Sequence, residues 1–483
     1  MKRLLTLLAS ALLLTAALCV SASAADYTST AEELSAIGMF RGTVNGGFEL
    51  DRAPRRSEAA IMLVRLYGAE EEAAAAYESG EISHPFRDVS KTASPYVAWL
   101  YTKGITKGVT ATTFNSGAAC SAKNYVVFLL RALGYQDGVD FQYADALDFA
   151  AGLGFYDDSL FGDGFLRDDL AAVTLQALAT DKKGGETYLL KSLIDSGVVD
   201  AAKAKALTEK IEAYRALMAR AAAIAKTDAL SARLTGAVSL NVLSTGKEEG
   251  EDYRLDSSFS LIPTGSLSII EKPLQASLDA QIKMTGTANG SQDSTTASMQ
   301  LWLKDSWVYL KADDGMGTTT SKKADVSEYL EFLQDALTQE TEESGDTALA
   351  VSYAPLVMMD GITVKTVGGN TVYTLSFDGS LAGIYDPEDG NVTDEDGVVY
   401  TEKLNDAKLD ITLTFNQSGV LTAMGVDAVY DRDSGVRYDA DNYSQDSTKI
   451  HIQLAVTFTY GSAVSISFPN PAQFTTVPAE DLI

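Results

Sequence analysis

The chain has 483 residues, in which 66 Asp and Glu outnumber 38 Lys and Arg to give a net charge of −28. This balance argues against nucleic-acid binding, because phosphate recognition depends on clustered basic side chains. Two cysteines and two histidines are too few for a disulfide scaffold or a four-thiolate zinc site, so we expect no metal and no cofactor. A 46% hydrophobic and 22% charged composition predicts a folded chain.

Residues 1–24 have the pattern of a secretory signal peptide. Lys2 and Arg3 precede an apolar run, and Ala22-Ser23-Ala24 forms a small-residue cleavage site. The alternative, a transmembrane anchor, is disfavoured because the run reaches only about 17 residues, the short limit for spanning a bilayer. We therefore expect a secreted protein that is not an integral membrane protein. Cleavage would leave Cys120 as its only thiol.

The next part of the chain contains an internal repeat. Five landmarks recur at one constant offset: Leu34, Gly38, Gly42, Phe48 and Leu66 correspond to Leu100, Gly104, Gly108, Phe114 and Ala132. A constant offset indicates a duplicated helix–turn–helix unit. A shorter third unit follows and closes with a helical segment at residues 188–207. The expected units are about 28–69, 86–136 and 143–207.

Three short motifs give these units a family resemblance. The second unit opens with Phe86-Arg87-Asp88-Val89 and continues through Gly104-Ile105-Thr106-Lys107-Gly108; the first carries Pro54-Arg55-Arg56-Ser57-Glu58. Residues 28–207 thus resemble S-layer homology repeats, which show F-x-D-V, G-I-x-x-G and I-T-R-A-E at these places. The resemblance implies a three-pronged helical domain that binds anionic, often pyruvylated, secondary polymers linked to peptidoglycan. It places the protein on the cell wall of a Gram-positive bacterium.

The resemblance also assigns the polymer-binding residues. Arg56 and Glu58 in the first unit, and Arg167 and Asp169 in the third, occupy the motif positions. The planar guanidinium fork of arginine matches a carboxylate. The second unit aligns on residues 120–124, which lack the motif Arg and Glu, so three equivalent sites are not expected. The competing interpretation is that Arg56 and Glu58 only pair with each other or cap a helix.

The second half changes from helical to strand periodicity. Residues 208–234 have apolar side chains at spacings of three and four, which predicts a bridging or leading helix. Apolar and polar residues then alternate, most clearly over 253–261, 409–415 and 450–460, which predicts antiparallel strands. Another helix is expected near 326–339. The predicted fold is an all-α three-repeat domain, followed over 235–483 by an α+β domain with a large curved antiparallel sheet covered by one or two helices.

This layout resembles, in pattern only, the half-barrel of periplasmic lipoprotein carriers and lipid-binding lipoproteins. The resemblance implies a lipid or other apolar ligand between sheet and helices, and a protein partner is the other option. The candidates to line such a pocket are Met299, Trp302, Trp307, Tyr309, Met358 and Met359. The alternative is a solid core without a cavity, which strand-spaced aromatic residues form more often.

The sequence offers little support for catalysis. His84 precedes Pro85 and His451 falls on the outer face of a strand; neither adjoins a nucleophile motif. Acidic stretches at 386–396 and 431–441 are interpreted as solvated hairpin tips, although clustered carboxylates also ligate Ca²⁺. We therefore expect a non-enzymatic surface protein. The alternatives are a wall-associated hydrolase with an unrecognised carboxylate pair and a purely structural surface protein.

Overall fold

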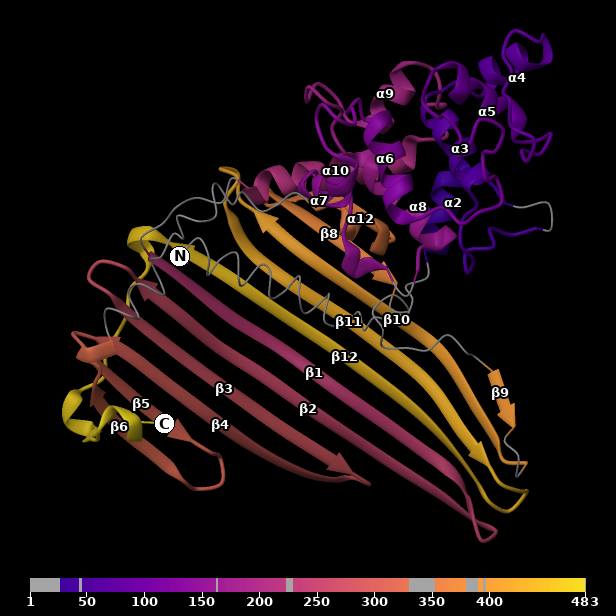
Figure 1. The fold of residues 1–483 in the computed structure, drawn as a ribbon. Coiled ribbons are helices and arrows are strands. Elements are labelled where there is room, and N and C mark those ends of the chain that lie inside the picture. The colour runs from indigo at the N-terminus through magenta and orange to yellow at the C-terminus, as the bar shows by residue number, and fades with distance from the viewer. Residues whose placement is uncertain are drawn as a thin grey trace. The chain divides into compact units, whose positions relative to one another are not determined.

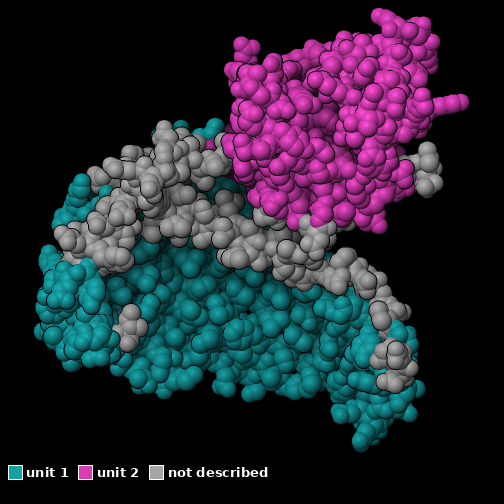
Figure 2. Space-filling view, viewed as in Figure 1, with its two compact units in different colours: residues 1–21, 219–347, 361–483 teal, residues 22–218, 348–360 magenta. Residues whose placement is uncertain are grey.

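The structure is a computed structural model that describes residues 27–42, 46–161, 164–222, 229–329, 352–378, 390–393 and 397–482. The predicted signal peptide lies outside these residues, as do most of the helix expected at 326–339 and most of the acidic stretch at 386–396. The chain divides into two compact units, coloured separately in Figure 2. The helical unit comprises residues 22–218 and 348–360, and the sheet unit comprises residues 1–21, 219–347 and 361–483.

The helical unit has helices in each of the three ranges where a repeat was expected (Figure 1). Their helices are α2 (Thr28–Ala36) and α3 (Arg56–Leu66); α5 (Ser94–Thr102) and α6 (Ala122–Ala132); and η1 (Tyr143–Asp145), α7 (Ala146–Gly152), η2 (Asp158–Leu160) and α8 (Arg167–Ala179). Three further helices are α4 (Glu70–Glu78), α9 (Leu189–Asp195) and α10 (Lys205–Ala222). The segment expected to be helical over 188–207 is therefore interrupted between α9 and α10. Helix α4, between the first two repeats, was not predicted.

Helix α8 lies at the centre of this unit. Every one of its residues is buried, including the polar side chain of Thr174. The Thr174 hydroxyl donates to the carbonyl of Leu170 and lies 2.7 Å from the Tyr125 hydroxyl of α6, so both polar groups are satisfied in the core. The turn glycine Gly108 has φ +74°, and a Cβ there would lie 2.3 Å from the Phe86 ring. Only glycine fits that turn.

The chain returns to the helical unit after entering the sheet. Helix α12 (Ala354–Met358) packs against α8. The amide of Tyr353 donates to the carbonyl of Gly154 at 2.8 Å, and the Tyr214 hydroxyl of α10 donates to the carbonyl of Ser352 at 2.7 Å. Residues 352–360 thus complete the core of a unit from which they are remote in sequence. The local pattern of apolar and polar residues did not predict that the chain returns to the helical unit here.

The sheet unit is built on long neighbouring strands (Figure 1). In chain order they are β1 (Ala229–Glu248), β2 (Glu251–Ile270), β3 (Gln275–Ala288), β4 (Ser291–Lys304), β5 (Trp307–Asp313), β6 (Thr319–Asp325), β7 (Gly361–Val367), β8 (Asn370–Asp378), β9 (Gly390–Thr393), β10 (Val399–Phe415), β11 (Leu421–Arg437), β12 (Tyr443–Tyr460) and β13 (Thr475–Thr476). Short 3₁₀ turns are η3 (Ser327–Tyr329), η4 (Gly461–Ala463), η5 (Pro471–Gln473) and η6 (Ala479–Asp481).

These strands form one sheet in the order β13-β6-β5-β4-β3-β2-β1-β12-β11-β10-β8-β7, with β9 also paired to β10. Every pairing is antiparallel except the short parallel contact of β13 with β6. The predicted fold class, a helical repeat region followed by a large antiparallel sheet, is confirmed. One boundary was wrong: α10 ends at Ala222 and β1 already begins at Ala229, because the alternation of apolar and polar residues starts at Leu230.

The cross-strand register gives the sheet one apolar and one polar face. Directly paired residues share a face, and one row across it is Tyr373, Leu413, Met424, Val456, Leu234, Gly265, Ala280 and Met299. A row on the opposite face is Thr457, Arg233, Ser266, Asp279 and Gln300. The predicted alternation is therefore confirmed. Asp431 and Asp433 lie inside β11 and not at a hairpin tip, since the strand continues to Arg437.

Candidate functional site

The motif helices of the three repeats begin in equivalent surroundings. The amide of Arg56, which opens α3, donates to the carbonyl of Ala118 in the second repeat at 2.8 Å. The amide of Arg167, which opens α8, donates to the carbonyl of Arg52 in the first repeat at 2.9 Å. The ammonium of Lys123, near the start of α6, donates to the carbonyl of Ala144 in the third repeat at 2.9 Å. Each helix start therefore meets another repeat, through its first backbone amide in α3 and α8 and through the Lys123 side chain in α6, and the three junctions close a ring.

Arg167 is buried in the junction between the third and first repeats. Its side chain is 5% exposed and forms an ion pair with Glu58 at 3.2 Å. Its Nε donates to the carbonyl of Phe48 at 2.8 Å, and its guanidinium lies 4.9 Å from the centre of the Phe40 ring. Burial lowers the pKa of Arg167, although the negative charge of Glu58 acts in the opposite direction and raises it. This motif arginine connects two repeats and has little surface to offer a ligand.

Glu58 is the other half of that connection. Its carboxylate accepts two hydrogen bonds from Arg52, at 2.6 and 3.1 Å, and one from the amide of Arg55 at 2.7 Å. Burial favours the neutral acid most strongly, but the bonds from Arg52 and Arg55 and the charge of Arg167 outweigh it and lower the pKa of Glu58. Glu58 thus caps α3, as one interpretation of the sequence expected. Among the described residues, Glu58 forms ion pairs with Arg52 and Arg167, and not with Arg56.

Asp169 occupies the same position in α8 as Glu58 does in α3. Its carboxylate accepts the amide of Leu166 at 2.7 Å, and the residue is 4% exposed. Burial raises the pKa of Asp169 to about 7, and the charge of Asp168 adds to this rise against the effect of the Leu166 amide. A buried carboxylate that titrates near neutrality caps its helix and is poorly placed to meet an anionic polymer.

Arg56 differs from Arg167 although the two residues are equivalent in the motif. Its guanidinium lies 5.0 Å from the centre of the Phe114 ring in the second repeat. Its Nε is buried and makes no hydrogen bond within the described part of the chain. The same residues contain no carboxylate paired with this guanidinium at ion-pair distance. Arg56 is therefore the motif arginine with an unused donor set.

The second repeat has replaced the motif pair by another arrangement. Ser121 caps α6 by accepting the amide of Asn124, and the Asn124 side chain accepts the hydroxyl of Tyr143 at 2.8 Å. Lys123 lies 5.8 Å from the centre of the Tyr143 ring. This junction has a cation over an aromatic ring, as the other two have, but it lacks an arginine fork. That the three repeats do not offer equivalent polymer sites stays a prediction.

Sequence reasoning missed the partners that distinguish the two arginines. Arg52, outside the recognised motif, holds Glu58 and also pairs with Glu49 at 2.6 Å. Phe40 and Phe114 lie under the two motif arginines but come from different places in their repeats. The repeat offset pairs Phe114 with Phe48, so no local signal connects Phe40 with Arg167.

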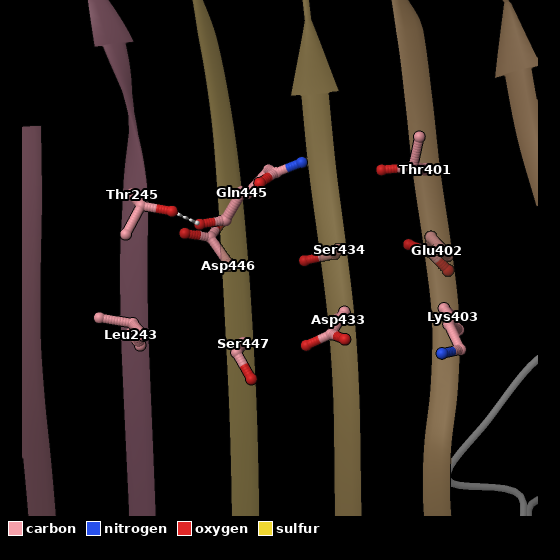
Figure 3. Close-up of a pocket in the computed structure, with 10 residues that line it drawn as sticks. All are labelled: Leu243, Thr245, Thr401, Glu402, Lys403, Asp433, Ser434, Gln445, Asp446 and Ser447. Atoms are coloured by element: carbon pink, nitrogen blue, oxygen red, sulfur yellow. Dashed lines mark hydrogen bonds between the residues drawn. The ribbon is translucent and has the colours of Figure 1, made fainter. Parts of the chain in front are cut away.

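In the sheet unit, the aromatic and methionine residues expected to line a pocket do not share one face. Met299 belongs to the apolar face, whereas Trp302 and Tyr309 are paired on the other and contact the Phe474 ring edge-on. An open depression on the sheet is polar and crosses β1, β12, β11 and β10 (Figure 3). Its lining includes Glu402, Lys403 and Asp433, which does not fit an apolar ligand.

The comparisons with known proteins bear on the helical unit. Residues 85–119 match the S-layer homology domain. The chain carries one recognised S-layer homology domain, which covers most of the second repeat. This domain indicates a cell-surface, cell-wall-associated location, and S-layer homology domains bind secondary cell-wall polymers. No helix within the described residues is long and apolar enough to cross a membrane.

No curated protein matches the chain. Among solved structures, the outer membrane protein OprG from Pseudomonas aeruginosa is similar at 8% identity and a TM-score of 0.13, over 49% of this chain and 99% of that one. A protein of a domain of unknown function from Brucella abortus is similar at 10% identity and a TM-score of 0.12, over 45% and 98%. Such low scores establish no shared fold. They give no support to the lipoprotein-carrier resemblance of the second half.

Proposed function

We propose that the protein is a non-enzymatic cell-surface protein whose helical repeats hold an anionic secondary wall polymer through Arg56. The observation that carries this proposal is the contrast between two equivalent arginines. Each guanidinium nitrogen of Arg167 has a partner, either Glu58 or one of two backbone carbonyls. The guanidinium of Arg56 has a ring on one side and no carboxylate partner in the described chain. A polymer carboxylate would supply the missing partner in the planar geometry that a guanidinium favours.

The other predicted polymer residues take positioning roles in this proposal. Glu58 and Asp169 cap the helices that carry the two arginines, at 2.7 Å from the amides of Arg55 and Leu166. Arg167 and Glu58 connect the first and third repeats. Together they hold the start of α3 rigidly, so that Arg56 meets its ligand without first being ordered. Rigid placement lowers the entropic cost of binding.

The sheet unit is the displayed part of the protein, and we propose that it binds an apolar partner on its apolar face. We also propose that the protein is not an enzyme. Its support is that His84 stacks against Phe86, while His451 and Asp427 form a pair on the solvated polar face, 2.7 Å apart. Neither arrangement contains an adjacent Ser or Cys nucleophile of the kind that a hydrolytic triad requires.

A cosedimentation assay tests the anchoring proposal. The full mature chain is mixed with purified Gram-positive wall sacculi that carry secondary polymer, and bound protein is measured after centrifugation. We expect saturable binding by the wild type and at least about a tenfold loss for Arg56→Ala, the scale of a lost charged hydrogen-bonding group. Arg56→Lys is expected to recover only part of it, because an ammonium lacks the fork.

The matched control is Lys203→Ala, which also removes one positive charge, from an exposed side chain outside the motif helices. It is expected to bind like the wild type at moderate salt. Equal losses of binding in Arg56→Ala and Lys203→Ala would show that the protein is held by its overall charge and not by a specific contact. Binding to sacculi stripped of secondary polymer would place the ligand elsewhere in the wall. Either result contradicts a specific contact through Arg56.

A further inference from the structure

The apolar face of the sheet changes character where β1, β2, β11 and β12 approach their hairpin turns. The cross-strand row at this end consists of Val436, Ser444, Gly246 and Tyr253. It lies on the same face as Phe259, because every second residue of a strand points to the same side. Serine and glycine, in the middle of this row, have a small side chain or none, so the face is hollowed here.

Tyrosine side chains surround this hollow, which has a volume of about 800 Å³. Tyr253 comes from β2, Tyr438 follows β11 and Tyr443 opens β12. A Cβ at Gly246 would lie 2.9 Å from Cε1 and from Oη of Tyr253, so the glycine lets this ring reach over β1. Tyr438 is 65% exposed. Glycine and tyrosine together form an open aromatic hollow of the size that small ligands occupy.

The two hairpin turns beside this hollow are tied to each other. The amide of Glu249, between β1 and β2, donates to the side-chain oxygen of Asn442 at 3.0 Å. The amide of Gly250 donates to the carbonyl of Asp441 at 3.1 Å. The amide of Tyr438 donates to the carbonyl of Asn442 at 3.1 Å. These bonds fix the turn that carries Tyr438 against the turn that joins β1 to β2, and such preorganisation lowers the cost of binding a ligand.

The polar groups of the hollow suit a ligand that has many hydroxyl groups. The hydroxyls of Ser244, Ser444 and Tyr253 can each donate and accept, and none of them has a hydrogen-bond partner within the described residues. The charged residues of the described lining are one cation, Lys247, and one anion, Glu248, which cancel. This balance contrasts with the charge of −28 on the whole chain and favours a neutral ligand.

We propose that this hollow binds a neutral oligosaccharide. Tyr253 and Tyr438 would offer amphipathic rings to the C–H faces of the sugar, and the free hydroxyls would bond to its hydroxyl groups. The hollow reaches from the end of β11 to β2, which is three strand spacings or roughly 14 Å, so it suits a chain of sugar rings better than a single ring. A cell-wall-associated location puts carbohydrate polymers within reach.

This site goes beyond the proposed function, because it is neither the junction of Arg56 nor the aliphatic part of the sheet face. A purely apolar ligand would cover the hydroxyls of the hollow without bonding to them, and burying unbonded polar groups is unfavourable. Sugar hydroxyls would replace the water at each of these groups while the tyrosine rings cover the apolar side of the sugar. The mixture of rings and hydroxyls therefore favours a carbohydrate over an apolar partner at this end of the face.

Isothermal titration calorimetry of the full mature chain with chitotetraose and with cellotetraose, two neutral oligosaccharides, tests this proposal. We expect saturable binding of at least one of them, with an affinity that changes little between low and high salt because the ligand is uncharged. Tyr438→Ala should weaken this binding about tenfold, the scale of a lost aromatic contact residue. Because Tyr438 is 65% exposed, the variant should keep the wild-type Tm. Tyr438→Phe should keep most of the affinity, since the ring remains.

The matched control is Tyr329→Ala, which removes another exposed tyrosine of the sheet unit. Tyr329 is 52% exposed and follows β6, on the far side of the sheet from β11. This variant should bind like the wild type. Three results would overturn the proposal: no saturable binding of either oligosaccharide, equal losses in Tyr438→Ala and Tyr329→Ala, or tighter binding of the anionic tetragalacturonic acid. The titration contains no secondary wall polymer, so failure here leaves the anchoring proposal through Arg56 standing.

Discussion

The two motif arginines predict opposite phenotypes for the same substitution. Arg167→Ala removes a side chain that is 5% exposed, its ion pair with Glu58, and its bonds to the carbonyls of Phe48 and Arg41. Breaking a buried ion pair costs about 3–5 kcal/mol, and we expect about 3 kcal/mol because Glu58 keeps Arg52 as a partner. Arg56→Ala removes mainly the contact with the Phe114 ring, worth about 1 kcal/mol.

Thermal unfolding followed by the helical far-UV circular dichroism signal measures this difference. For a unit of this size, about 3 kcal/mol corresponds to a loss of roughly 6–12 °C in Tm, against a few degrees for the Arg56 variant. Below its transition, Arg167→Ala should still sediment with wall polymer, whereas Arg56→Ala should be stable but unbound. Equal Tm losses for the two variants would refute the assignment of one arginine to stability and the other to binding. So would normal stability combined with lost binding in Arg167→Ala.

Four further outcomes are expected. Because the pKa of Asp169 is raised to about 7 in the fold, above the ordinary value of about 4, stability should fall as pH rises from 4 to 7, and Asp169→Asn should flatten this trend in urea titrations. The pKa of Glu58 is lowered, so Glu58→Gln should destabilise at pH 7, with the difference shrinking as the pH falls below about 4. Burial raises the pKa of the Cys120 thiol to about 11, so alkylation at pH 8 should be slow until urea unfolds the chain. Ile411→Ala, at a site 0% exposed in the sheet, should cost about 2–5 kcal/mol.

Each of these outcomes has a result that contradicts it. A pH trend that survives in Asp169→Asn would assign the titration to another group. A Glu58→Gln penalty that is independent of pH would show that lost packing, and not lost charge, is responsible. Rapid alkylation of Cys120 in the native protein would mean that the junction around it opens readily. A free energy of unfolding for Ile411→Ala equal to that of the wild type would show that the site relaxes fully around the smaller side chain.

The periodic features of the sequence predicted most of the fold. Alternation over 409–415 predicted the apolar face of β10, and the repeated Gly104 and Gly108 predicted the turn of the second repeat. These signals are local, because strand and helix geometry impose them on neighbouring residues. The return of residues 352–360 to the helical unit was not predicted. That contact joins segments far apart in sequence, and nothing in a local pattern encodes it.

The sequence by itself determined that Arg56 and Arg167 are equivalent, since both open a motif helix and both stand two residues before a carboxylate. Only the tertiary structure decided which of the two arginines is available to bind a ligand. The third repeat packs on the first so that Arg167 reaches Glu58, Phe48 and Phe40, while the Arg56 side chain lies over the Phe114 ring of the second repeat and pairs with no carboxylate among the described residues. Ion pairing depends on which repeats become neighbours in the ring, and a one-dimensional motif does not contain that information.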